Sequence, residues 1–446
     1  MKMTSVRLLF IFLTTSLLTS STALSRGIVE EGYYLFDKQR LLFDQIKKQE
    51  DLTIDHLGNA GYEVYGPKGV GEWLRSVSEI YDVKMMSLEE ETKATPFNNY
   101  PSHEEITQKL FDLQAQYPEI LHITSLGKSK NGRDIWSAKI SSNVKVDEVE
   151  PEFKYIANMH GDEIVGRELM LLLIEDVLNQ YEAGNRTIRS LVNNTEIYII
   201  PSMNPDGASS RRRGNANYVD LNRNFPDFTR DRDSNPQNRE LETQAIMAFQ
   251  AQRKFALSAN FHGGVECVNY PWDTKKEHFP LVDLARLLSV EYAQEVPGMV
   301  NSRQFDGGVT NGYDWYPVKG GMQDWSYYWF NDLQVTIELS QTKWPNYQTI
   351  PQYYNWNRNS ILRYMTRVHQ GVGFKLSSDI SGDVEIIQGQ NLSLGHFSFS
   401  DGEFYKVLEP GQYKLIITEA SGRERLVETS VTAQAAEFTP NYVYLN

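Results

Sequence analysis

The sequence predicts an α/β protein in which helices cover a mostly parallel or mixed sheet. Helical segments are expected at 105–116 and 166–181, and apolar strand-like runs lie at 153–159, 195–200 and 255–261. Such alternation is typical of a sheet with helices packed on its faces. Polar residues directly follow two of the strand-like runs, which is where α/β enzymes place their sites.

The composition is that of a globular protein with room for two or three domains. The chain has 446 residues, of which 40% are hydrophobic, and its formal net charge is -14. Basic residues cluster only at 211–213, so nucleic-acid binding is not expected at a sequence pI near 5.2. The acidic balance suits basic substrates, and it is equally ordinary for an exported protein.

Residues 1–23 have the pattern of a secretory signal peptide. Lys2 and Arg7 precede an apolar run at 8–18, and small residues suited to cleavage lead up to Ala23. The run is shorter than the roughly 20 residues that a membrane-spanning helix needs. We therefore expect an exported protein, periplasmic or secreted, with no stable membrane insertion after cleavage.

Residues 25–91 predict a small α/β module, and a linker rich in Pro, Asn and Thr follows at 92–102. The expected elements of the module are helices at 34–49 and 69–80 and strands at 61–65 and 81–85. At the other end, the sequence after residue 371 changes to short alternating strands separated by turns. This pattern predicts a separate β-domain at 372–446.

A candidate metal site begins with His160 and Glu163, three residues apart at the end of a strand-like run. A second run delivers His262 about a hundred residues later. Two imidazoles and one carboxylate, with a fourth position open, form the ligand set of a catalytic zinc. A histidine and a glutamate at this spacing are also common as solvated surface residues, so the pair needs support from other motifs.

Two further polar features lie downstream of the first pair. One short stretch contains an acid, an amide and a guanidinium, on Asp220, Asn222 and Arg223. The guanidinium can bind a carboxylate through two parallel hydrogen bonds. The same stretch also suits an ordinary surface loop. Glu338 lies in the otherwise apolar run 335–340, where a buried charge costs several kcal/mol unless it is paired or functional.

These blocks resemble the zinc metallocarboxypeptidases, in the branch that contains carboxypeptidases E, N, D and M. The resemblance extends from about residue 100 to the C-terminus. It is carried by the motifs at 160–168, 204–207, 213–227, 262–264, 269–273, 311–316, 320–324 and 336–340. It implies a mixed eight-stranded sheet sandwiched by helices, a catalytic domain at 96–371, and a transthyretin-like β-sandwich at 372–446.

The resemblance implies one zinc ion on His160, Glu163 and His262. Asp220 falls on the position of a carboxylate that orients the first histidine, as such ligands are commonly held. The zinc is expected to activate a water for attack on the peptide bond.

The resemblance also assigns roles around the scissile bond. Asn222, Arg223 and Tyr316 fall on the positions that grip the terminal carboxylate of the substrate, and Arg213 on the position that polarises the scissile carbonyl. Glu338 falls on the general base and acid. The expected partners are therefore the C-termini of peptides or proteins.

The expected specificity is for C-terminal Lys or Arg. Asp273, eleven residues after His262, matches an acid in the side-chain pocket of this branch, and Gln323 matches a second polar pocket residue. A desolvated carboxylate there favours a basic side chain. Asp273 also lies in turn-forming sequence, so a turn residue is the alternative interpretation.

Three questions stay open at this stage. The module at 25–91 is either an inhibitory prodomain, by analogy of position with pancreatic carboxypeptidases, or a permanent accessory domain. The enzyme is alternatively a peptidoglycan-peptide amidopeptidase, or a catalytically silent binding protein. Cys267 is the single cysteine, which excludes an intramolecular disulfide and favours a bacterial source. We expect its side chain to be a small buried residue that fills space in the core. The role of the neighbouring Glu266 is left open.

Overall fold

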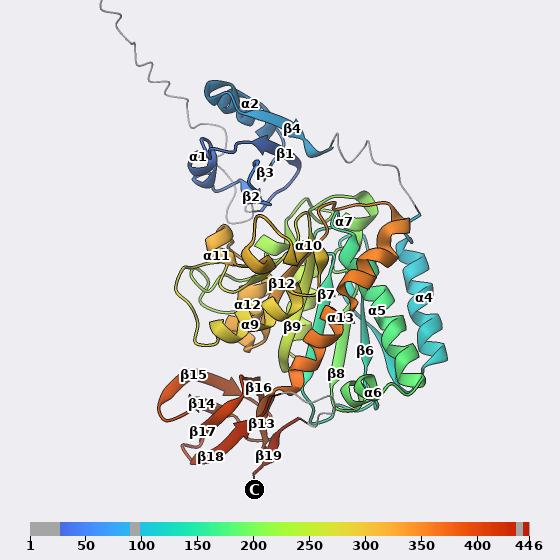
Figure 1. Cartoon of the computed structure of the whole chain (residues 1–446), viewed down its shortest axis with the longest axis vertical. Helices are drawn as coiled ribbons and strands as arrows, with labels where there is room; N and C mark the ends of the chain where they lie inside the picture. Colours follow the sequence, from blue (N-terminus) through green and yellow to red (C-terminus); the bar gives the residue numbers. More distant parts are fainter. Residues whose placement is uncertain (1–26, 90–98, 434–439, 446) are drawn as a thin grey trace, which may run out of the picture.

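The computed structural model describes residues 27–89, 99–433 and 440–445. The predicted signal peptide and most of the predicted linker lie outside these residues. Figure 1 shows a small N-terminal module, a central α/β domain and a C-terminal β-domain arranged along the long axis. Among the described residues, no helix combines the length and apolar character needed to cross a membrane.

The N-terminal module is an antiparallel sheet in the order β2-β3-β1-β4, with two helices. Leu35, Tyr62, Val64 and Leu74 are fully buried and form its core. The elements are β1 (Glu31–Phe36), α1 (Phe43–Lys47), β2 (Thr53–Asp55), β3 (Tyr62–Gly66), α2 (Val70–Tyr81) and β4 (Lys84–Ser87).

The expected helix at 34–49 is wrong for its first part. Residues Glu31–Phe36 form strand β1, and only Phe43–Lys47 are helical. Aromatic residues such as Tyr33 and Tyr34 favour a pleated strand, and both β3 and β4 supply backbone partners for it. Pairing on both sides overrides a weak helical pattern.

The central domain contains the eight-stranded mixed sheet that the family resemblance implies, in the order β11-β10-β12-β9-β7-β8-β6-β5. Strands β8, β7, β9 and β12 run parallel in its middle. The strands are β5 (Leu121–Lys128), β6 (Asp134–Ile140), β7 (Glu152–Ala157), β8 (Glu196–Ile200), β9 (Phe255–Gly263), β10 (Cys267–Tyr270), β11 (Val309–Asn311) and β12 (Leu333–Leu339).

Helices pack on both faces of this sheet. Along β7, Tyr155 belongs to one buried apolar cluster and Ile156 to another, as alternation along a strand requires. Helix α13 runs beside α5 (Figure 1). The α-helices are α4 (His103–Gln116), α5 (Val165–Glu182), α6 (Arg186–Asn193), α7 (Pro205–Ser210), α8 (Leu241–Gln250), α9 (Val282–Ala293), α10 (Pro297–Val300), α11 (Gly312–Trp315), α12 (Met322–Phe330) and α13 (Ile350–Thr366). The short 3₁₀ helices are η1 (Leu221–Arg223), η2 (Asp306–Gly308), η3 (Tyr347–Thr349) and η4 (Arg367–His369).

Helix α4 shows how local sequence sets an element's start. Ser102 accepts a hydrogen bond from the Glu105 amide at 3.2 Å, and the Glu105 carboxylate accepts one from the Ser102 amide at 2.7 Å. This capping box satisfies two amides that a helix start otherwise leaves unpaired. The helix therefore begins two residues before the position expected from periodicity.

The C-terminal domain is a β-sandwich, as predicted. Its two sheets have the orders β16-β13-β19 and β15-β14-β17-β18. Lys406 is fully buried at the junction with the central domain, where its Nζ donates to the Asn331 carbonyl at 2.7 Å. The strands are β13 (Gly371–Lys375), β14 (Gly382–Gln388), β15 (Leu392–Phe399), β16 (Glu403–Val407), β17 (Gly411–Glu419), β18 (Glu424–Val431) and β19 (Tyr442–Tyr444).

Candidate active site

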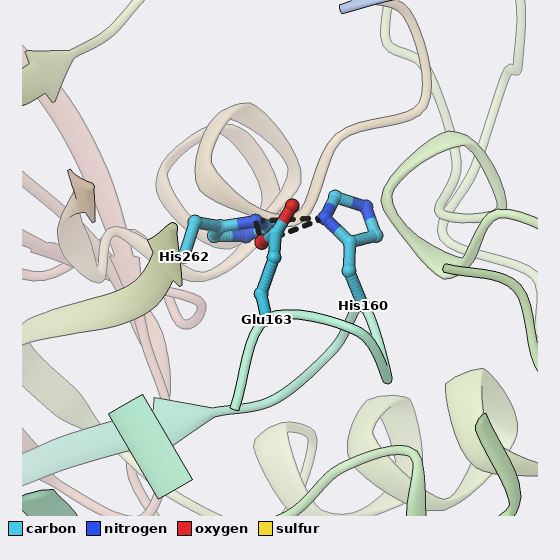
Figure 2. A group of neighbouring side chains, drawn as sticks. All are labelled: His160, Glu163 and His262. Carbon is cyan, nitrogen blue, oxygen red and sulfur yellow. Dashed lines mark hydrogen bonds and ion pairs between the residues drawn. The ribbon is translucent and has the colours of Figure 1, made fainter. Parts of the chain in front are cut away.

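The three predicted zinc ligands come together at the carboxyl ends of neighbouring parallel strands. His160 follows β7, Glu163 lies in the turn before α5, and His262 lies near the end of β9. The Nδ1 atoms of His160 and His262 lie 3.0 Å apart, and Glu163 Oε2 lies 3.0 and 2.9 Å from them (Figure 2). All three side chains are buried.

The chemistry of this donor set fits a metal ion. Two imidazole nitrogens and a carboxylate oxygen converge, and each of these atoms can offer a lone pair to a cation. Without a cation, burial and Arg213 lower the pKa of His160, but Glu163 and Asp220 raise it to a net value of about 9. Burial and the neighbouring His160 lower the pKa of His262. A cation at this point satisfies all three donors at once.

Asp220 links the metal site to Arg213. Its Oδ1 lies 3.0 Å from His160 Nε2, and its Oδ2 lies 3.0 and 2.9 Å from Arg213 Nε and Nη2. The Asp220 carboxylate therefore fixes which imidazole nitrogen of His160 faces the metal, as a second carboxylate typically does. Burial would raise the pKa of Asp220, but Arg213 and His160 hold it well below its usual range.

Glu338 lies on β12 directly beside the metal ligands. It is paired in register with His262 on the neighbouring parallel strand β9. The side chain is 5% exposed, and its Oε2 has no hydrogen-bond partner among the described residues. Burial, then the nearby Glu163, raises the pKa of Glu338 well above its usual range. A buried carboxyl beside the metal ligands whose Oε2 has no structural partner suits acid–base work.

Asn222, Arg223 and Tyr316 line the same pocket as the two histidine ligands and Glu338. Asn222 is held by its Oδ1, which accepts a hydrogen bond from the Met322 amide at 3.0 Å. Arg223 Nη1 donates to the Asn222 carbonyl at 3.0 Å. The pocket thus presents a guanidinium and a phenol that can donate to an anion.

Asp273 lines the same pocket, and Gln323 binds it there. Asp273 is 4% exposed, and its Oδ1 accepts hydrogen bonds from Asn269 Nδ2 at 3.0 Å and Gln323 Nε2 at 3.1 Å. Thr336 in turn donates to Gln323 Oε1 at 2.9 Å. Burial, then the neighbouring Asp324, raises the pKa of Asp273 well above its usual range. Asn269 and Thr336 were not assigned roles from sequence, although both lie inside recognised motifs.

The structure also brings two unexpected residues into the site, both from the N-terminal module. Asp55 forms an ion pair with Arg213 and accepts a hydrogen bond from the Tyr316 hydroxyl. His56 Nε2 lies 3.8 Å from Glu163 Oε1. Nothing in residues 25–91 resembles a peptidase motif, so sequence patterns gave no signal for this contact.

The two residues whose roles were uncertain lie beside the site. Cys267 on β10 is fully buried with Val265 and Phe305, as expected for a small filler. Glu266 Oε2 accepts a hydrogen bond from Gln341 Nε2 at 3.2 Å at the protein surface. Neither contributes a metal-binding atom to the group formed by His160, Glu163 and His262.

Comparison with known families settles the relationship. Residues 106–360 match the family model described as zinc carboxypeptidase. The chain belongs to the zinc carboxypeptidase family. Its metal is zinc, bound by His160, Glu163 and His262. This zinc carboxypeptidase is a hydrolase that acts on peptides.

Its relatives belong to the carboxypeptidase D, M and N branch. Mouse carboxypeptidase M is 35% identical over 367 residues, which cover 76% of this chain and 82% of the relative. The mouse carboxypeptidase N catalytic chain is 32% identical, covering 76% of this chain and 81% of the relative. Human carboxypeptidase D is 38% identical over 67% of this chain, but the match spans only 24% of that longer protein.

Solved structures confirm the fold. Carboxypeptidase A from Helicoverpa armigera aligns with a TM-score of 0.59 at 20% identity, covering 77% of this chain and 98% of that structure. Thrombin-activatable fibrinolysis inhibitor aligns with a TM-score of 0.56 at 16% identity, covering 77% and 99%. At these identities the likeness concerns the fold.

Proposed function

We propose that this zinc carboxypeptidase removes C-terminal Lys or Arg residues from peptides or proteins. The observation that carries the proposal is the buried carboxylate of Asp273. Asn269 and Gln323 bind its Oδ1, and its Oδ2 has no hydrogen-bond partner among the described residues. A guanidinium or ammonium group entering the pocket finds an acceptor that two fixed amides already hold in position.

The charge state of Asp273 supports a basic rather than an apolar ligand. Burial and the neighbouring Asp324 raise the pKa of Asp273, and Arg223 offsets this only in part. A basic side chain beside Asp273 supplies a further positive charge and favours the ionised form of the carboxyl. An apolar side chain leaves a buried polar group without a partner, which is costly. The pocket therefore favours substrates whose last residue is Arg or Lys and disfavours those that end in Phe or Leu.

The terminal carboxylate of the substrate is assigned to Arg223, Asn222 and Tyr316. These residues line the pocket together with Asp273. A guanidinium binds a carboxylate with two parallel hydrogen bonds, and the phenol adds a third donor. Recognition at both ends of the last residue restricts cleavage to chain ends.

The reaction proposed for this site is hydrolysis of the last peptide bond. When bound, zinc lowers the pKa of a coordinated water towards neutrality. Glu338, buried and unpartnered, accepts a proton from the attacking water and returns it to the leaving amine. Arg213, held by Asp220, donates to the carbonyl oxygen as negative charge develops there.

We also propose that the chain is exported and of bacterial origin. The signal-like residues 1–23 and the single cysteine, Cys267, support this. Expression of the whole chain in a bacterial host followed by fractionation and N-terminal sequencing tests export. A periplasmic or secreted product beginning after Ala23 is expected, and an intact cytoplasmic chain contradicts the proposal.

The test of activity is a panel of peptides that differ only in their last residue: Arg, Lys, Phe, Glu and diaminopimelate. We expect release of Arg and Lys by the zinc-loaded chain. The Glu338→Gln variant should lose activity about 10²- to 10⁴-fold, the usual contribution of a general base, while it retains zinc. Retained zinc shows that the loss is not a loss of metal.

Other outcomes of the panel exclude the proposal. Preferential release of diaminopimelate would instead indicate a cell-wall amidopeptidase. Normal turnover by Glu338→Gln would remove this residue from the mechanism. Silence on all five peptides, both in the wild-type chain and in variants that weaken the contacts of the N-terminal module with the site, would indicate a silent scaffold.

A further inference from the structure

Residues 160–163, here called the ligand turn, carry two of the three zinc ligands. Figure 2 shows His160 and Glu163 projecting from this turn, while His262 comes from a separate strand. Among the described residues, one backbone hydrogen bond lies within the turn, from the Glu163 amide to the His160 carbonyl at 3.2 Å. The positions of both ligands therefore depend on contacts from outside the turn.

The side chain of Asn158 supplies such contacts. Asn158 directly follows β7 and is fully buried. Its Nδ2 donates to the His160 carbonyl at 2.9 Å. The same nitrogen also lies close to the carbonyl oxygens of Glu163, at 3.3 Å, and Gly161, at 3.4 Å. One amide group therefore binds the backbone of both metal-binding residues of the ligand turn.

The orientation of this amide is fixed by Ser202. The Ser202 hydroxyl, in the segment that follows β8, donates to Asn158 Oδ1 at 2.8 Å. The reverse orientation of the amide would place its oxygen against three carbonyl oxygens, none of which has a hydrogen to donate. Because β7 and β8 are neighbouring parallel strands, the contact joins the ends of two strands of the sheet. The ligand turn is thereby tied to β8 as well as to β7.

The backbone at Asn158 explains why an asparagine suits this position. Its φ is +56°, a left-handed value that asparagine adopts more readily than most residues other than glycine. The Asn158 carbonyl accepts a hydrogen bond from the Asn204 amide at 3.2 Å, which fixes the bend from the far side. Glycine would also tolerate this φ, but it has no side-chain amide. Asparagine provides both the backbone conformation and the donor.

The ligand turn also packs closely against helix α7. A Cβ atom added at Gly161 would lie 2.0 Å from the carbonyl carbon of Gly207. The turn therefore has no room to move towards α7, and the amide of Asn158 holds its carbonyls on the side of the sheet. Groups that hold metal ligands in place commonly change metal affinity or activity about 10- to 100-fold when they are removed.

We propose that Asn158, held by Ser202, is a positioning residue for the zinc site and acts through the carbonyls of His160 and Glu163. The residues that line the pocket around Glu338 do not include Asn158, so no direct role in substrate binding is assigned to it. The inference concerns the affinity for zinc. It holds whichever C-terminal residue the enzyme prefers.

The test measures the Kd of Zn²⁺ for the full chain by competition with a chromophoric chelator. Asn158→Gly removes the amide and keeps the left-handed backbone free of strain. Asn238→Gly, the same substitution at an exposed asparagine with φ +63°, is the matched control. Near-UV circular dichroism verifies that each chain is folded. We expect the Kd to rise about 10- to 100-fold in Asn158→Gly and to stay unchanged in the control.

Ser202→Ala provides a second, milder test because it leaves the amide of Asn158 in place. We expect a smaller rise in the Kd of Zn²⁺, and no further rise when Ser202→Ala is added to Asn158→Gly, since the hydroxyl acts through that amide. A general loss of stability would instead add in both backgrounds. Additive effects of this kind would overturn the proposal. So would a Kd within about twofold of the wild-type value in folded Asn158→Gly. If Asn158→Gly does not fold, the same result in Ser202→Ala would overturn it.

Discussion

Substitution of Asp273 by Asn tests the side-chain pocket with little change of shape. Asn keeps an oxygen for the two amides of Asn269 and Gln323, which lie 3.0 and 3.1 Å from Asp273 Oδ1. It places an amide NH₂ where the free Oδ2 now faces the pocket, so an incoming guanidinium loses its acceptor and meets a donor. A hydrogen bond between charged groups contributes about 1.5–3 kcal/mol. That range corresponds to a fall of roughly 10- to 150-fold in kcat/KM for Arg-terminated peptides.

The assay compares kcat/KM for peptides ending in Arg and in Phe, with variant and wild-type chains loaded equally with zinc. The ratio of Arg to Phe should fall by the full factor, because the chemistry at the zinc site is untouched. Asp314→Asn, an exposed acid of helix α11, gives the same change of net charge nearby and should leave the ratio unchanged. An unaltered ratio in Asp273→Asn would refute the assignment of this residue to the pocket.

Three further outcomes are expected. Removal of zinc by a chelator should abolish activity and lower the melting temperature, and reloading should restore both, since an ion held at about 1,000 times its Kd contributes about 4 kcal/mol to the folded state. Gly312→Ala should reduce kcat/KM for Arg peptides more than for Phe peptides, because its Cβ would lie 1.7 Å from Asp273 Oδ1. His369 is buried with a pKa lowered to about 4, mainly by burial, so the unfolded chain binds a proton before the native one as pH falls. About 3 kcal/mol of stability should be lost between about pH 6.5 and 4, and urea denaturation should show a smaller loss in His369→Gln.

The catalytic constellation could be predicted from sequence because its chemistry is tied to local motifs. His160 and Glu163 lie in one turn, and Asp220 lies in the same short motif as Arg223. Each such block follows a strand end or forms a loop that the alternation of helices and strands already places at one edge of the sheet. A functional role for Glu338, whose Oε2 has no hydrogen-bond partner among the described residues, could also be predicted. Burying a carboxylate in an apolar strand costs free energy unless the group is paired or functional.

The contact of the N-terminal module with the site could not be predicted. Asp55 lies in a three-residue strand without a recognisable motif, and its partner Arg213 is 158 positions away in another domain. The spacing of apolar residues along the sequence predicts helices and strands, but it does not predict which surfaces of two separately folded units contact each other. The mistaken helix at 34–49 has a related cause, because β1 is stabilised by strands β3 and β4 rather than by its own sequence.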